Sequence, residues 1–176
     1  LETFEYQDQK KVRFNSFEMA KAEDNLVTRT KILFNAKDIS GEFYRTSFTN
    51  LFTYVSNRIP EISDTLYQID EAVKAGFGWK LGPFETWDAV GLDAAIALIE
   101  ESGNKPKQWV YEMKESGIDS FYKIENGLKY FYDIESKSYK EVPGQNASIS
   151  LEILRPTNNV WGNSGTTITD LGDGIL

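Results

Sequence analysis

The chain of 176 residues contains no cysteine and no histidine. Without cysteine, disulfide bonds, thiolate nucleophiles and cysteine metal ligands are excluded. Without histidine, Ser–His and Cys–His nucleophile pairs are excluded, and the commonest zinc ligand is missing. We therefore expect no metal site in this chain.

Positive charge is also scarce, because 19 Lys and Arg residues face 27 Asp and Glu residues, giving a net charge of −8. This balance repels a phosphate backbone, so we expect no nucleic-acid partner. No run of about 18 apolar residues occurs, so we expect no membrane span. The apolar fraction of 40% is enough for a packed core. The absence of cysteine and of a signal sequence favours the cytoplasm.

Both ends of the sequence suggest a piece of a longer polypeptide. The chain starts at Leu1 rather than at methionine, and it stops within the apolar stretch Gly174–Leu176. We expect a fragment.

Apolar residues recur at spacings of three and four between about residues 16 and 117, which predicts a series of amphipathic helices. Ser16 and Ser40 are predicted N-caps, and Pro60 is predicted to end the longest helix near Asn57–Ile59. The side chains predicted to be buried are Phe48, Phe52, Val55, Trp87 and Trp109.

After residue 117 the period changes to two. Phe121–Glu125 and Leu128–Glu135 alternate around Asn126-Gly127, a dipeptide typical of type I′ hairpin turns. Tyr139–Val142 is a candidate third strand. The expected fold class is therefore mainly α with a small antiparallel β-meander.

Changes of pattern divide the chain into four predicted parts. They are a linker over 1–15, a helical domain over 16–117, the β-meander over 118–145, and a trailing segment over 146–176. Within the trailing segment, Ser148–Leu154 and Thr166–Leu171 are predicted strands.

The segment Gly76–Pro83 is rich in glycine, but its spacing fits neither the dinucleotide fingerprint nor the P-loop, and it follows a helix rather than a strand. We interpret it as a tight connection between helices, in which Gly78 and Gly82 allow close approach and Pro83 starts the next helix.

Three carboxylates near tryptophans leave an alternative open. Glu61, Glu85 and Asp88 lie close in sequence to Trp79 and Trp87. A carbohydrate-active enzyme needs two such carboxylates, and Glu61 with Glu85 is the candidate pair, about 5–9 Å apart in a cleft. The same carboxylates also suit the first turns of helices. A protein-interaction module with an apolar surface patch is a further alternative.

Several motifs together resemble the C-terminal helical domain of 3-hydroxyacyl-CoA dehydrogenases. They are Asn57-Arg58, then Ile69-Asp70-Glu71-Ala72-Val73, then the segment Gly76–Asp93, which contains Gly-Pro-Phe-Glu at Gly82–Glu85. The resemblance covers roughly residues 40–100. It implies a helical fold like the C-terminal domain of 6-phosphogluconate dehydrogenase.

The sheet and the trailing segment extend the resemblance to fused β-oxidation enzymes that join this dehydrogenase to an enoyl-CoA hydratase. In that family a Rossmann domain binds NAD, two helical copies follow, and a crotonase domain comes downstream. The resemblance implies that this chain is the second helical copy with the first hydratase strand in 146–176. Its partners would be the Rossmann domain, the first helical copy, the crotonase domain and the acyl-CoA substrate. NAD would belong to the parent enzyme, with no cofactor bound by this chain.

Asn57 matches the position at which the family's first helical copy holds its substrate. The interval from Asn57 to Ile69-Asp70 is about three turns shorter here, and Pro60 breaks the helix. Asn57 therefore suits a structural role better, bonding a carbonyl in its helix, while Arg58 can meet an anion or the helix dipole. We expect no catalytic residue in this chain, and a structural role within the dehydrogenase.

Overall fold

The computed structural model describes residue 6 and residues 12–145, 149–163 and 165–176. The helices are α1 (Asn15–Ala22), α2 (Leu26–Asn35), α3 (Ile39–Asn57), α4 (Leu66–Phe77), α5 (Pro83–Val90), α6 (Leu92–Glu101), α7 (Gln108–Glu115) and α8 (Leu151–Asn158). The strands are β1 (Tyr122–Glu125), β2 (Leu128–Asp133), β3 (Ser138–Glu141), β4 (Asn159–Gly162) and β5 (Thr167–Thr169). The expected fold, mainly α with a small antiparallel meander, is confirmed.

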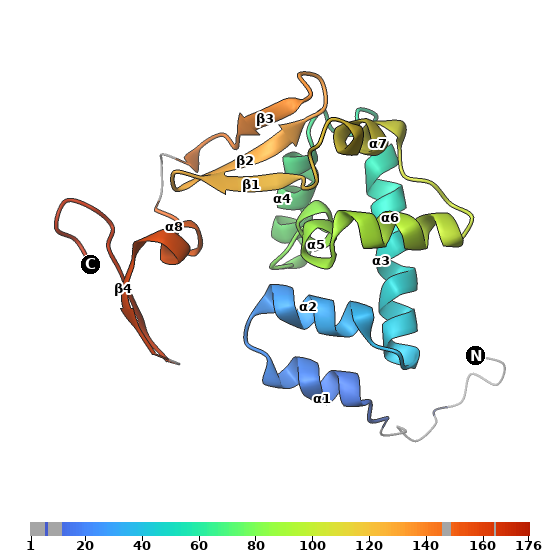
Figure 1. Ribbon diagram of the computed structural model, residues 1–176, viewed down its shortest axis with the longest axis horizontal. Helices are drawn as coiled ribbons and strands as arrows, with labels where there is room; N and C mark the ends of the chain where they lie inside the picture. Colours follow the sequence, from blue (N-terminus) through green and yellow to red (C-terminus); the bar gives the residue numbers. More distant parts are fainter. Residues whose placement is uncertain (1–5, 7–11, 146–148, 164) are drawn as a thin grey trace.

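The first seven helices and the three-stranded sheet form one body, and the long helix α3 runs along one side of it from α2 to α7 (Figure 1). The sheet lies above α4 and α5, while α1 and α2 form the opposite end (Figure 1). Helix α8 and the hairpin β4–β5 project to one side of this body (Figure 1). None of the helices in the described part of the chain combines the length and apolar character needed to cross a bilayer.

The start of α3 is held by Asp38, not by the predicted cap Ser40. The Asp38 carboxylate accepts the Gly41 N–H (3.1 Å) and the Ser16 hydroxyl (2.7 Å). Ser40 also donates to Asp38 (2.6 Å), so it stabilises the true cap from inside the helix. Ser16 likewise lies within α1, whose N-cap is Phe14. The two serines predicted as caps therefore join α1 to α3 through one carboxylate, whose pKa they lower to about 2.

Aromatic rings form the centre of the core. Phe52 of α3 stacks on Trp87 of α5 at a centroid distance of 4.8 Å, and Trp87 contacts Phe121 at 5.1 Å. Trp109 of α7 reaches the same cluster and donates its indole N–H to the Ser56 carbonyl (3.0 Å). Of the five side chains predicted to be buried, four are, and Phe48 is half-buried.

The sheet follows the order β1-β2-β3 with antiparallel pairing throughout. Asn126 and Gly127 both take positive φ values (52° and 74°), as the predicted type I′ turn requires. The register aligns Tyr122 with Phe131 and Ile124 with Lys129. Side chains of alternate residues share a face, so these four lie together on the face toward α4 and α5.

The trailing segment corrects one prediction. Ser148 lies outside the described residues, but Leu151–Asn158 forms α8, so the predicted strand over Ser148–Leu154 is wrong. A short apolar run fits either period, and here Leu154 of the helix lies beside Gly127 in the hairpin turn of the meander. The second predicted strand is confirmed as β5, paired with β4. The predicted linker over 1–15 lies largely outside the described residues.

Replacing Phe52 with Ala should lower the free energy of unfolding by about 3–5 kcal/mol, because the substitution empties a fully buried ring position. Phe43→Ala on the same helix is the matched control, since Phe43 is 67% exposed, and it should change stability by less than about 0.5 kcal/mol. Urea unfolding followed by circular dichroism measures both. Equal losses in the two variants would contradict this description of the core.

Candidate functional site

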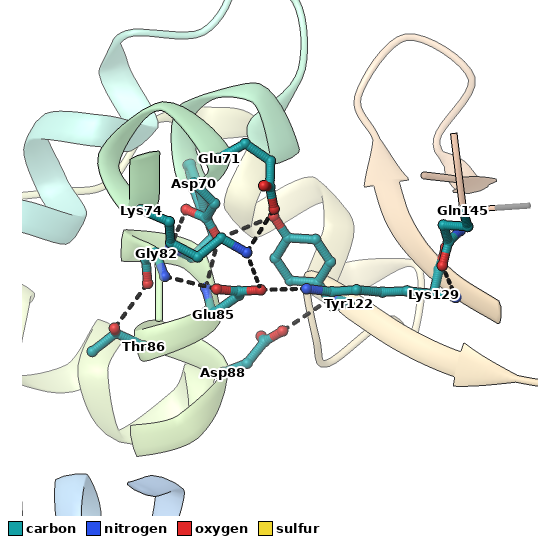
Figure 2. A network of polar contacts seen from close by, with 11 residues as sticks. Asp70, Glu71, Lys74, Gly82, Glu85, Thr86, Asp88, Tyr122, Lys129 and Gln145 are labelled. Carbon is teal, nitrogen blue, oxygen red and sulfur yellow. Dashed lines mark hydrogen bonds and ion pairs between the residues drawn. The ribbon is translucent and has the colours of Figure 1, made fainter. Parts of the chain in front are cut away.

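A network of buried and half-buried polar groups joins α4, α5 and the sheet (Figure 2). At its centre Asp70, a residue of α4 that is only 1% exposed, faces the first turn of α5. One carboxylate oxygen accepts the Phe84 N–H and the other accepts the Glu85 N–H, each at 2.9 Å. These are the first free N–H groups of α5, because Pro83 has none. Asp70 therefore caps a neighbouring helix.

The N-cap position of α5 is Gly82, which has no side chain with which to cap the helix itself. A Cβ atom at Gly82 would lie 2.3 Å from the Cβ and Cγ atoms of Asp70, so the carboxylate fills the space that a side chain would need. The Gly82 N–H is accepted by Glu85 Oε2 at 2.7 Å. Gly82, Asp70 and Glu85 thus form one capping unit.

Glu85 also forms ion pairs with two lysines. Lys74 of α4 contacts its Oε1 atom at 3.1 Å, and Lys129 of β2 contacts the same oxygen. Lys129 lies over the Tyr122 ring as well, 4.1 Å from its centroid (Figure 2). Burial acts to raise the pKa of Glu85, but the two lysines and the Gly82 N–H outweigh burial and lower it.

Asp88, one turn further along α5, binds the edge of the sheet. Its two oxygens accept the N–H groups of Phe121 (2.8 Å) and Tyr122 (2.9 Å). The Tyr122 hydroxyl returns to α4 and donates to Asp70 at 3.0 Å. Burial raises the pKa of Asp70 and that of Asp88 to about 7, although the N–H donors oppose this shift. The two carboxyls therefore fix the sheet to both helices.

A cleft of about 870 Å³ opens beside this network, between the α4–α5 pair and the segment that follows β3. Lys74, Glu85, Asp88 and Lys129 line it. The carboxylates among them are already engaged by main-chain N–H groups or by lysines, so neither is poised as a general base. In the described part of the chain, no group of three or more acidic side chains is arranged to hold a metal ion.

The motif Asn57-Arg58 lies elsewhere, at the end of α3. The Asn57 amide donates to the Thr53 carbonyl at 2.9 Å within its own helix. The Arg58 guanidinium pairs with Glu61 at 2.9 Å and lies 5.0 Å from the Tyr54 ring centroid. Asn57 therefore makes the helix-end hydrogen bond that the structural interpretation predicts.

The predicted carboxylate pair of a carbohydrate-active enzyme is not brought together. Glu85 lines the cleft and carries two lysines, whereas Glu61 is exposed, pairs with Arg58 and does not line that cleft. Asp88, the third carboxylate of that interpretation, is bound to the sheet.

Gly76–Pro83 is a connection between helices, as predicted. Helix α4 continues to Phe77 and is closed by Gly78, whose φ of 67° is left-handed. A Cβ at Gly78 would meet nothing within 4 Å, so Gly78 serves the turn and not the close approach that we expected of it. The close approach is confirmed at Gly82.

The sequence did not single out Asp70, Tyr122 or Lys129 by role. One signal was available: Asp70 stands four residues after Leu66, on the inward face of an apolar helix. A carboxylate there needs donors, and the Gly82-Pro83 helix start, which lacks a capping side chain, supplies them. Tyr122 and Lys129 gave no comparable signal, because their role depends on how the sheet packs.

Comparison with known proteins bears on the same segment. Residues 51–117 match the family described as "3-hydroxyacyl-CoA dehydrogenase, C-terminal domain". This region belongs to that family. The capping unit and Asp88 all lie within the matched residues.

Two bacterial proteins are similar to this chain. A Bacillus subtilis (strain 168) protein named as a 3-hydroxyacyl-CoA dehydrogenase is 34% identical over 174 residues, 98% of this chain and 22% of that protein. A Rickettsia felis protein named as a fatty acid oxidation complex trifunctional enzyme is 30% identical over 106 residues, 50% of this chain and 15% of that protein. The match thus spans about a fifth of the Bacillus relative's length and less of the Rickettsia felis relative's. No solved structure matches it significantly.

Replacing Gly82 with Val should lower the free energy of unfolding by roughly 1–3 kcal/mol, because the new side chain displaces the Asp70 carboxylate from α5. Gly76→Ala is the matched control. Gly76 lies inside α4, and a Cβ atom there would have nothing within 4 Å, so alanine should leave stability unchanged or raise it by up to about 1 kcal/mol. Thermal melts of both variants, recorded with and without NAD or coenzyme A, measure the change in stability. Equal stability of Gly82→Val and the parent chain would contradict the capping unit.

Raising the pH from about 4 to 8 should lower the free energy of unfolding. Asp70 and Asp88 have folded pKa values of about 7 against an ordinary value of 3.8, so the folded state binds more protons across this interval. The contribution of these two carboxyl groups to the free energy of unfolding is complete below about pH 4, where both are protonated, and it is lost as the pH rises through about 7. Urea unfolding at several pH values measures the slope, and Asp88→Asn should make it shallower. An unchanged slope in Asp88→Asn would contradict the assignment.

Proposed function

We propose that this chain is part of a bifunctional fatty-acid β-oxidation enzyme, an NAD-dependent 3-hydroxyacyl-CoA dehydrogenase joined to an enoyl-CoA hydratase. The match of residues 51–117 supports the dehydrogenase, and the name of the Rickettsia felis relative supports a parent with several activities. That the chain spans only 22% of its Bacillus relative is consistent with a larger parent.

Within that enzyme the chain has a structural role: it completes the substrate cleft and is inactive alone. The observation that supports this proposal is that the candidate site residues form hydrogen bonds within the chain itself. Both oxygens of Asp70 accept main-chain N–H groups of α5, and both oxygens of Asp88 accept those of Phe121 and Tyr122 at the start of the sheet. Asn57, the one side chain at a substrate-binding position of the family, bonds within its own helix.

NAD does not fit the glycine-rich segment of this chain. The segment leaves a helix through the left-handed Gly78, and at Gly82 the Asp70 side chain occupies the space that a phosphate would need. A carboxylate at that helix start also repels an anion. We therefore assign NAD to another part of the parent, the Rossmann domain.

We also propose the domains that this chain packs against and the cellular compartment of the parent enzyme. The helical region would pack against the Rossmann domain and the first helical copy, next to the acyl-CoA substrate, and residues 146–176 would lead into the crotonase domain. The parent would act in the cytoplasm. The hairpin β4–β5 at the end of the chain is consistent with such a junction, because a two-stranded sheet is marginal by itself.

The test is NADH formation from 3-hydroxybutyryl-CoA and NAD, followed by absorbance. The complete polypeptide that contains this chain should form NADH, and this chain alone should not. NADH formation by the chain alone would contradict the structural role. Its absence from the complete polypeptide, in the presence of a folded protein, would contradict the enzyme assignment itself.

A further inference from the structure

The tip of the hairpin between β1 and β2 is the two-residue loop Asn126-Gly127, which lies beside α8 (Figure 1). Asparagine followed by glycine is chemically reactive, because the glycine nitrogen can attack the asparagine side chain with no Cβ atom of its own in the way. The sequence contains this pair once. The folded turn decides whether the pair is free to react.

Both reacting groups are available in the folded turn. The Asn126 side chain is exposed, and its amide forms no hydrogen bond with the described part of the chain. The Gly127 N–H also has no acceptor among the residues that the structure describes, because the ladder of the hairpin begins at the Glu125–Leu128 pair. The two groups can therefore approach each other without first breaking a hydrogen bond.

Asn57 provides the contrast within the same chain. Its amide donates to the Thr53 carbonyl at 2.9 Å. The next N–H, that of Arg58, donates to the Val55 carbonyl at 3.1 Å. Both groups that would have to react at this position are thus held by the helix end, and the residue that follows carries a long side chain. Asn57 should therefore be protected where Asn126 is not.

We propose that Asn126 is a site of spontaneous deamidation in the folded protein, with the Gly127 main-chain nitrogen as the nucleophile. This nitrogen loses its proton to hydroxide and attacks the Asn126 Cγ atom. The N–Cγ bond forms and the Cγ–Nδ2 bond breaks, and the departing nitrogen takes a proton from water and leaves as ammonia, which regenerates the hydroxide. Water then opens the five-membered succinimide ring. Opening at Cγ gives aspartate, and opening at the main-chain carbonyl gives isoaspartate.

The two products differ in their effect on the hairpin tip. Asp-Gly also suits a type I′ turn, so aspartate keeps the turn and adds one negative charge next to Glu125. Isoaspartate routes the main chain through Cβ and Cγ and lengthens the loop, where a Cβ atom at Gly127 would already lie 3.5 Å from Leu154 of α8. The other end of the sheet remains bound to Asp88. Formation of isoaspartate therefore changes the contact between the meander and α8 and leaves the attachment of the sheet to α5 intact.

Peptide mass spectrometry tests the proposal. The complete polypeptide that contains this chain is incubated at several pH values, both folded and unfolded in guanidinium chloride, and circular dichroism verifies the folded state. Digestion then gives the fractions of aspartate and isoaspartate at positions 126 and 57. Asn126→Gly is the matched control variant, because Gly-Gly also forms type I′ turns and has no side-chain amide.

We expect the folded protein to form products at position 126 about ten times faster than at 57, or more, because glycine places no side chain against ring closure. Isoaspartate should be among the products, and the rate should rise with pH, since the glycine nitrogen must first lose its proton. The Asn126→Gly peptide should show neither product.

Two results would overturn the proposal. If the folded protein forms products at 126 no faster than at 57, the turn protects the pair, whatever the unfolded chain does. If aspartate forms at 126 without isoaspartate, water hydrolyses the amide directly and no succinimide is made. Both results are independent of NADH formation, so they leave the proposed function untouched.

Discussion

The arrangement of the helical body depends on one buried carboxylate at the start of a helix that it does not belong to. Asp70 of α4 takes the first two free N–H groups of α5, which otherwise would be buried without partners. This contact fixes the approach of α4 to α5, and it requires glycine at 82 because a side chain there would occupy the same space. The Gly-Pro-Phe-Glu sequence is thus explained as a helix start: a vacant cap, a proline without an N–H group, and a glutamate that reaches back.

The same carboxyl group connects the helices to the sheet. Tyr122 bonds Asp70, and Asp88 bonds the main chain at Phe121 and Tyr122, so α4, α5 and β1 meet at two carboxyls. Lys129 of β2 and Lys74 of α4 neutralise Glu85 beside them. The chain has no histidine or cysteine, and the carboxylates that resemble a catalytic cluster, Asp70, Glu85 and Asp88, instead hold the helices and the sheet together. The structural role proposed for the chain follows from that use of its polar groups.

Local pattern was sufficient to predict much of the fold. Helical spacing, the proline that begins α5 and the Asn126-Gly127 turn specify the helices and the hairpin within a few residues, since each depends on neighbours in sequence. Long-range contacts were not predictable in this way. Ser16 looks like a cap, yet its hydroxyl donates to Asp38, which is 22 residues away and comes near only on folding. The apolar residues after Ser148 fit both the period of a helix and that of a strand, and contacts with the rest of the fold favour the helix. For the candidate site, the motif residues were found, but the capping role of Asp70 depends on a contact fourteen residues away.

The most direct test of the central claim is a double-mutant cycle on Asp70 and Gly82, with the free energy of unfolding as the measured quantity. Asp70→Ala removes the acceptor, and Gly82→Ala introduces the Cβ atom that the carboxylate excludes. If the two residues form one capping unit, each single change destabilises the chain, and the double variant loses at least about 1 kcal/mol less than the sum of the two. Losses that add to within about 0.3–0.5 kcal/mol would mean that Asp70 and Gly82 act independently, and this would contradict the account.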